Sequence, residues 1–369
     1  MIFAAHRRAA RLALPALMLL LALAAPPADA RQSVKKSIWG PVRVNGVSQF
    51  PIYRDLGAGV YQTSLTWSSI APTRPARPTD PTDPAYLWPA VVDDAIGQAR
   101  SHGTRVALLI QGSPPWANGG RDQRFVPRQP SDFANFAAAA SRRYPGVRLW
   151  MIWGEPTRRA NFQPLLHERR DRPLTRQMRR GPHTYARLLD AAYGALKRSN
   201  RRNLVIGGNS FVTGDVSPRN WIKNLRLPNG RPPRMDLYGH NPFSARRPDL
   251  RRRPLGHGFA DFSDLDTLAG WVDRYLRRPR RGRMKLFLSE FFIPTDHFNE
   301  EFNFYVSRRT AASWLGSALR ITRRWSRIYT LGWFSLYDDP PRADRMEVNR
   351  GLLDYKGARK PAYSVYRSG

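Results

Sequence analysis

Eight short runs of apolar residues recur along the chain, and in most of them hydrophobic side chains follow one another without polar alternation. Runs of this kind are typical of a parallel sheet with both faces covered, because neither face then needs polar residues. Several runs are rich in β-branched and aromatic residues, which favours strands. The expected strands cover residues 37–42, 60–67, 105–110, 150–155, 204–209, 235–240, 285–290 and 329–336.

Helical or loop patterns separate these runs. Val92, Ile96 and Ala99 recur at helical spacing before Gly103, which we expect to close that helix. Ser131 is the expected N-cap of the following alanine-rich helix. The expected helices cover residues 89–103, 132–144, 183–198, 265–276 and 305–324, with a short connection at 50–58 and a short tail at the end.

This alternation predicts an α/β protein, a single-domain (β/α)8 TIM barrel over residues 31–369. A doubly wound open sheet fits the alternation almost as well. However, no glycine-rich fingerprint for a dinucleotide follows the first strand. The barrel is therefore the preferred interpretation.

Two of the six glutamates in the chain stand at the ends of predicted strands. Glu155 ends an apolar run and precedes Pro156, which cannot extend a central ladder because it lacks an N–H. Glu290 ends the run that begins at Lys285. The carboxyl ends of barrel strands meet at one mouth, where such folds carry their chemistry. Two carboxylates facing one cleft are the minimal equipment for glycoside hydrolysis.

The first thirty residues resemble a signal peptide. A basic segment with Arg7, Arg8 and Arg11 precedes an apolar stretch at 12–25, and Ala28-Asp29-Ala30 supplies a cleavage pattern. The apolar stretch is shorter than the roughly 20 residues that a membrane span needs, although an uncleaved anchor remains the alternative. We expect cleavage after Ala30 and a secreted, extracellular protein.

The formal net charge is +33, from 61 Lys and Arg against 28 Asp and Glu. A positive charge of this size attracts polyanions. Non-specific polyanion binding is therefore one interpretation of the charge, and a solvated surface with a bias toward arginine is the other. No recognised nucleic-acid motif accompanies the charge, so we expect no specific nucleic-acid partner. The absence of cysteine excludes a thiol nucleophile and any cysteine-ligated metal.

The motifs resemble those of the clan A glycoside hydrolases, which are retaining (β/α)8 enzymes. Trp153-Gly154-Glu155-Pro156 at the fourth strand and Ser289-Glu290-Phe291 at the seventh carry this resemblance. The resemblance implies that Glu155 is the acid/base and Glu290 the nucleophile. It also implies that no cofactor or metal takes part. Cellulase-like and xylosidase-like members look most similar.

One position departs from the pattern of the clan. Its members usually have asparagine before the acid/base glutamate, where the amide binds the sugar 2-hydroxyl, but this chain has Gly154. Contacts of this kind strengthen in the transition state and contribute several kcal/mol. The departure motivates the alternative to a glycosidase, which is a weak or inactive barrel that binds carbohydrate or anionic polymer.

Six further residues are candidates for binding substrate, because they lie at or near strand ends. Tryptophan rings there could stack on sugars or pack the upper barrel. His240 could bind substrate or be a satisfied structural histidine, and Asn209 could replace the missing asparagine. His297 and its neighbours Glu300 and Glu301 match no trusted metal-ligand spacing. The candidates for substrate binding are Trp67, Trp116, Asn209, His240, Trp333 and Tyr337. We expect a carbohydrate substrate and a monomer.

Overall fold

The computed structural model of the 369-residue chain describes residues 32–276, 282–299, 302–344 and 346–369. The predicted signal peptide, Glu300 and Glu301 lie outside the described residues. Within these ranges, no helix combines the length and the apolar character that crossing a bilayer requires.

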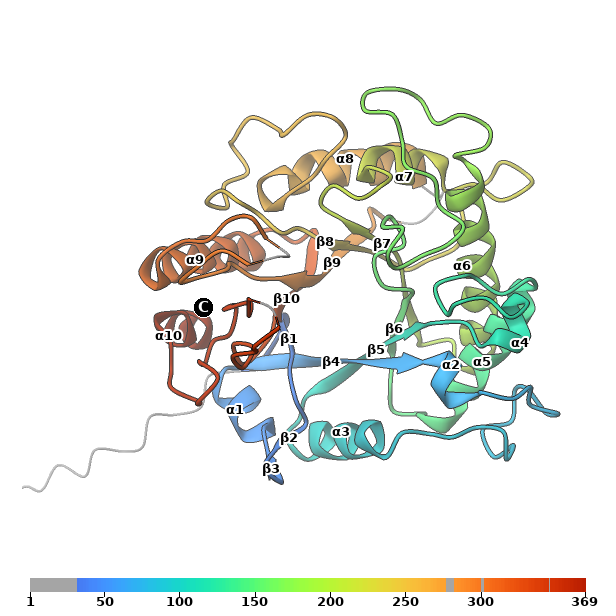
Figure 1. Ribbon diagram of the computed structural model, residues 1–369, viewed down its shortest axis with the longest axis horizontal. Helices are drawn as coiled ribbons and strands as arrows, with labels where there is room; N and C mark the ends of the chain where they lie inside the picture. The colour runs from blue at the N-terminus through green and yellow to red at the C-terminus, as the bar shows by residue number, and fades with distance from the viewer. Residues whose placement is uncertain (1–31, 277–281, 300–301, 345) are drawn as a thin grey trace, which may run out of the picture.

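Eight parallel strands in the described part of the chain close into a barrel, which confirms the predicted (β/α)8 fold (Figure 1). Each strand pairs with its neighbours in chain order, and the first strand pairs with the last. The barrel strands are β1 (Ser33–Trp39), β4 (Ala58–Thr66), β5 (Arg105–Gln111), β6 (Leu149–Ile152), β7 (Leu204–Phe211), β8 (Leu237–Asn241), β9 (Lys285–Phe291) and β10 (Ile328–Phe334).

Helices surround this barrel on the outside (Figure 1). They are α1 (Phe50–Asp55), α2 (Trp67–Ile70), α3 (Ala90–Ser101), α4 (Pro115–Asn118), α5 (Pro130–Arg143), α6 (Arg180–Ser199), α7 (Pro218–Asn224), α8 (Leu265–Leu276), α9 (Arg308–Arg324) and α10 (Pro361–Ser368), with a 3-10 turn at Phe262–Asp264. A two-stranded hairpin, β2 (Arg43–Val44) and β3 (Val47–Ser48), lies between β1 and α1.

Several details differ from the sequence prediction, and strand β6 ends at Ile152 rather than at Glu155. Helix α5 starts at Pro130, with Gln129 rather than Ser131 at the N-cap position. Proline suits the first helical position because the N–H that it lacks would have no partner within the helix there. The expected terminal tail contains α10, and α7 forms in the connection between the fifth and sixth strands, where the sequence predicted no element.

Two hydrophobic layers hold the barrel together. Side chains inside it, from Val60, Leu109, Met151, Ile206 and Phe287 among others, form one buried cluster. A larger cluster fills the space between the strands and the helices. Successive strand residues point to opposite faces, so the two clusters draw on alternate positions of the same strands. Both faces of each strand are thus covered, as the unbroken apolar runs predict.

Candidate functional site

The segment after β6 turns sharply at the barrel mouth. Trp153 and Glu155 have positive φ angles of 63° and 41°. Residues with a side chain rarely adopt this conformation, which costs on the order of 1 to 3 kcal/mol each and tends to persist at functional sites. The surrounding structure therefore has to hold this turn in place.

Asn209 and Asn161 brace the turn from two sides. The amide of Asn209, on β7, donates to the carbonyl oxygens of Ile152 and Trp153 at 3.0 and 2.8 Å. The indole N–H of Trp153 donates to the Asn161 carbonyl oxygen at 2.8 Å. Asn209 is only 4% exposed. Through these two hydrogen bonds, the buried Asn209 amide fixes the backbone just before Glu155.

The Glu155 carboxylate accepts hydrogen bonds from three side chains. Arg158 Nη1 and Asn161 Nδ2 donate to Oε2 at 2.9 and 3.1 Å, and Asn241 Nδ2 donates to Oε1 at 2.9 Å. The Arg158 contact is an ion pair, and its guanidinium also lies over the Phe211 ring, 4.6 Å from the centroid. Glu155 is therefore held firmly on both oxygens.

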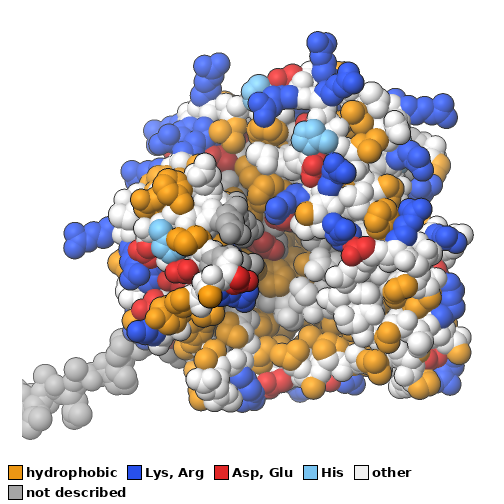
Figure 2. All heavy atoms as spheres, in the orientation of Figure 1, with side chains coloured by type: hydrophobic (Ala, Val, Ile, Leu, Met, Phe, Trp, Pro, Cys, Tyr) orange, Lys and Arg blue, Asp and Glu red, His pale blue; other side chains and the backbone are white. Residues whose placement is uncertain are grey.

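Asn241 links Glu155 to Glu290. It is the last residue of β8, and its Oδ1 accepts a hydrogen bond from the backbone N–H of Glu290 at 3.1 Å. Its amide nitrogen binds Glu155 at the same time. One buried side chain thus touches both predicted catalytic residues, and the structure brings the ends of β6, β8 and β9 together. Figure 2 shows a hollow near the middle of this face, with charged side chains at its rim.

Polar side chains fill the layer below Glu290. Gln62 donates to Ser37 Oγ and to the Ser289 carbonyl oxygen, and it accepts from Ser289 Oγ at 3.1 Å. The indole N–H of Trp39 also donates to the Ser289 carbonyl, at 3.0 Å. The backbone that carries Glu290 is therefore fixed by side chains of β1 and β4, which are not neighbours of β9 in the barrel.

Gln111 occupies the space that the absent asparagine side chain leaves free. A Cβ atom built on Gly154 would lie 2.8 Å from Gln111 Oε1, and the Gly154 N–H already donates to that oxygen at 3.3 Å. Because Oε1 accepts the Gly154 N–H, the amide nitrogen of Gln111 points away from the Gly154 backbone. Gln111 also lines a hollow of about 250 Å³ with Thr66, Trp153 and Asn161.

The tryptophan candidates lie mostly in the core. Trp67 and Trp333 are each 1% exposed, and Trp67 stacks on Phe136. Trp116 is half-buried, donates to the Ala71 carbonyl oxygen at 2.8 Å, and is covered by the Arg74 guanidinium. The rings of Trp67 and Trp333 are thus closed to solvent, whereas that of Trp116 is partly exposed.

Phe334, the neighbour of Trp333, is half-buried. It contacts Trp39, its register partner on β1, at 6.0 Å between ring centroids. Trp39 packs against the cluster inside the barrel, whereas Phe334, like Trp333, packs with the cluster under the helices. Arg350 lies over Phe334, 4.8 Å from the ring centroid. Trp39 and Phe334 are therefore the aromatic pair at this part of the mouth.

His240 and Tyr337 are both engaged internally. His240 is fully buried, with Nδ1 2.8 Å from Ser210 Oγ and Nε2 2.8 Å from the Ala260 carbonyl oxygen. A carbonyl can only accept, so Nε2 carries the proton and Nδ1 accepts from the serine. Tyr337 is half-buried and its hydroxyl donates to Gln49 Oε1 at 2.7 Å. His240 therefore points away from Glu155, unlike Asn241 beside it.

Burial makes His240 a source of pH-dependent stability. Desolvation lowers its pKa to about 4, below the ordinary value of 6.5. The folded state thus favours neutral histidine, so this contribution is complete above pH 6.5 and is lost as the pH falls towards 4. We expect the free energy of unfolding, measured with urea, to fall between pH 7 and 4.5 by about 2 kcal/mol more for the wild type than for His240→Gln. Parallel losses in both proteins would contradict this assignment.

Four residues of the site were not predicted from the sequence: Gln111, Arg158, Asn161 and Asn241. Asn241 and Gln111 each end a strand, so a rule that considers every polar strand-end residue would have found them. Arg158 and Asn161 lie in an irregular loop, where no periodicity indicates the direction of a side chain.

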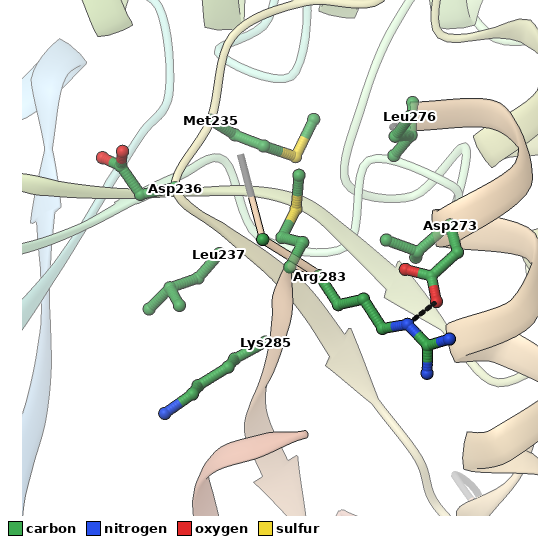
Figure 3. Close-up of a pocket in the computed structure, with 10 residues that line it drawn as sticks. Met235, Asp236, Leu237, Asp273, Leu276, Arg283 and Lys285 are labelled. Carbon is green, nitrogen blue, oxygen red and sulfur yellow. Dashed lines mark ion pairs between the residues drawn. The ribbon is translucent and has the colours of Figure 1, made fainter. Parts of the chain in front are cut away.

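A second hollow, of about 610 Å³, lies at the opposite end of the barrel (Figure 3). It is lined by the starts of β8 and β9, around Leu237 and Lys285, and by α8, where Arg283 lies 3.8 Å from Asp273. It is therefore separate from the mouth that carries Glu155.

No protein-family model matches this chain, and no curated protein does. Solved structures show the same fold. They include a family 39 glycoside hydrolase from Bacteroides cellulosilyticus WH2, with a TM-score of 0.65 at 16% identity over 91% of this chain and 64% of that chain. A glucosidase from Croceicoccus marinus gives 0.63 at 17% identity, over 93% of this chain and 66% of that one. A monomeric β-xylosidase from Caulobacter crescentus CB15 gives 0.60 at 14% identity, over 92% and 68%.

The chain thus spans about two thirds of the length of these neighbours. At such low identity the likeness establishes the barrel fold and not an activity.

Proposed function

We propose that this protein is a retaining glycoside hydrolase that cleaves O-glycosidic bonds of a polysaccharide or oligosaccharide. Glu290 acts as the nucleophile and Glu155 as the acid/base. The observation that carries the proposal is the contact of Asn241 with both residues, 2.9 Å to the Glu155 carboxylate and 3.1 Å to the Glu290 backbone. Two glutamates joined through one side chain at a barrel mouth suit the chemistry at a single anomeric carbon.

In the first step, a Glu290 oxygen forms a bond to the anomeric carbon while the bond to the leaving oxygen breaks. Glu155 gives its proton to that oxygen. In the second step, Glu155 takes a proton from water, whose oxygen bonds to the anomeric carbon and releases Glu290. Retention follows, because the anomeric carbon is inverted twice.

The ion pair of Arg158 with Glu155 bears on this cycle. Arg158 donates to Oε2, so a proton on that oxygen would displace the guanidinium contact, and the ion pair stabilises the ionised form of Glu155. This contact favours the second candidate function, a weak or inactive barrel that binds carbohydrate. The leading proposal also includes secretion and a monomeric state, which are expectations from the sequence.

Trapping with 2-deoxy-2-fluoro glycosides of several configurations tests the proposal. A retaining enzyme forms a stable glycosyl ester, and peptide mapping should find it on Glu290. The anomer first released from a natural substrate, read by NMR, should match that of the bond cleaved. Absence of hydrolysis on a broad glycan panel, together with binding to one glycan, would favour the binding barrel.

Gln111 is our proposed replacement for the missing asparagine. Its amide nitrogen would donate to the sugar 2-hydroxyl, so Gln111→Ala should lower kcat by about 10²-fold. Gly154→Asn alone should also lower it, because the new side chain meets Gln111 Oε1. The double variant Gln111→Ala/Gly154→Asn should recover much of the loss, since it restores one amide without the collision. Additive losses measured on an aryl glycoside would contradict this role.

A further inference from the structure

A groove on the outer wall of the barrel gathers arginines. It lies between α9 and the loop that follows β8, and its volume is about 600 Å³. Figure 2 shows Lys and Arg side chains gathered where these two segments lie. Leu250, Ile321 and Trp325 supply its apolar wall. Its arginines are Arg247, Arg251, Arg252, Arg320 and Arg324, with Asp249 as the acidic residue among its lining.

Two of these guanidinium groups are held side by side. Arg247 Nε and Arg320 Nη2 both donate to the hydroxyl of Ser317, each at 3.1 Å. Ser317 is buried at 5% exposure and donates its own proton to the Ser313 carbonyl oxygen. The hydroxyl therefore fixes two like charges near one point. An anion placed between them would remove a repulsion of about 1 kcal/mol or more.

The adjacent Arg246 shows what a structural arginine looks like in this loop. It forms ion pairs with Asp261 at 2.7 Å and with Asp264 at 2.9 Å. Arg247 forms no ion pair with any described carboxylate, nor does Arg320. Arg320 and Arg324 also stand four residues apart on α9, where like charges weaken a helix slightly. The positive charges of Arg247 and Arg320 are therefore not neutralised by a described carboxylate and can attract an anion.

We propose that this groove is a binding site for an acidic polysaccharide that carries uronate carboxylates. A guanidinium group matches a planar carboxylate through two parallel hydrogen bonds, and the paired Arg247 and Arg320 offer two such groups. A groove of about 600 Å³ has room for more than a single ion, which suits a chain. Single-stranded nucleic acid prefers several exposed aromatic rings. Among the described residues that line the groove, Trp325 is the one aromatic side chain, and it is half-buried.

The site lies outside the barrel mouth, so it goes beyond the proposed hydrolysis and does not depend on it. Its role would be to keep the protein on an acidic glycan while the mouth is free to act. Binding by the groove and diffuse attraction by the net charge differ in one testable respect. Only the first depends on which arginines are removed.

The test compares two variants of the full chain that lose the same charge. Arg247→Gln/Arg320→Gln removes the paired guanidinium groups, and Arg100→Gln/Arg201→Gln removes two exposed arginines elsewhere. Binding of an oligogalacturonide is measured by calorimetry at about 0.15 M salt, where the Debye length is about 8 Å. We expect the first variant to bind at least about tenfold more weakly, and the control to change less than about twofold. The Glu290→Gln background keeps the probe intact.

Equal loss in both variants, or no binding by the wild type, would overturn the proposal. So would stronger binding of an oligothymidylate of equal charge that depends on the same two arginines, because the partner would then be nucleic acid. Arg247→Lys/Arg320→Lys keeps the charge but loses the planar fork. We expect its affinity to fall between those of the wild type and the glutamine variant. Unchanged thermal unfolding midpoints confirm that the exposed substitutions leave the fold intact.

Discussion

Replacing Glu290 by alanine is expected to lower turnover of every glycoside by roughly 10⁴-fold or more, because no covalent intermediate can form without the carboxylate. The loss should be the same for good and poor leaving groups. Steady-state rates on aryl glycosides that span a range of leaving-group pKa values provide the measurement. Turnover close to wild type on any one of them would show that another group is the nucleophile.

Glu290→Gln is the matched control, since it keeps the size of the side chain and removes its charge. The backbone N–H of Glu290 still donates to Asn241 in both variants, so the link to Glu155 is preserved. Unchanged thermal stability would then assign the loss to chemistry rather than to folding.

Replacing Glu155 by alanine should have an effect that depends on the substrate. Poor leaving groups need a proton, and the loss of a general acid should slow them by about 10² to 10⁴-fold. The dinitrophenolate of a dinitrophenyl glycoside departs without a proton. Formation of the glycosyl-enzyme should therefore be nearly as fast in the variant as in the wild type. Hydrolysis of that intermediate lacks its base, so a burst of dinitrophenolate should precede slow turnover.

Asn241→Ala is the control for the acid/base assignment. It removes the hydrogen bond to Glu155 Oε1 but leaves the carboxylate, which Arg158 and Asn161 still hold. Its effect should not depend on the leaving group as strongly as that of Glu155→Ala. Equal dependence in the two variants would mean that Glu155 does not supply the proton.

The sequence was sufficient for the barrel because its strands are apolar on both faces. The same property hides which residue of a pair faces inward. His240 and Asn241 are adjacent, yet His240 contacts Ser210 and Ala260 while Asn241 contacts Glu155. The sequence prediction chose His240, and the structure places its neighbour Asn241 at the mouth, since a strand alternates with a period of two.

Elements with strong periodicity were predicted most closely, and helix α8 begins and ends at its expected residues. Short elements with a proline at the start, such as α7 and α10, show too few turns for a pattern to emerge. Arg158 escaped prediction for a different reason. Its position depends on the positive φ angle of Glu155, which no local propensity indicates.

Closure of the barrel ties the two ends of the described chain together. Ser37 on β1 is in register with Gly332 on β10, and Lys36 Nζ donates to the Tyr366 carbonyl oxygen of α10 at 2.8 Å. One edge of β1 therefore stays unpaired until β10 has been synthesised. A nascent chain cannot close the barrel while β10 is still inside the exit tunnel of the ribosome. Pairing between strands so far apart in the sequence forms late, so the first strands stay open to other contacts through most of the barrel's synthesis.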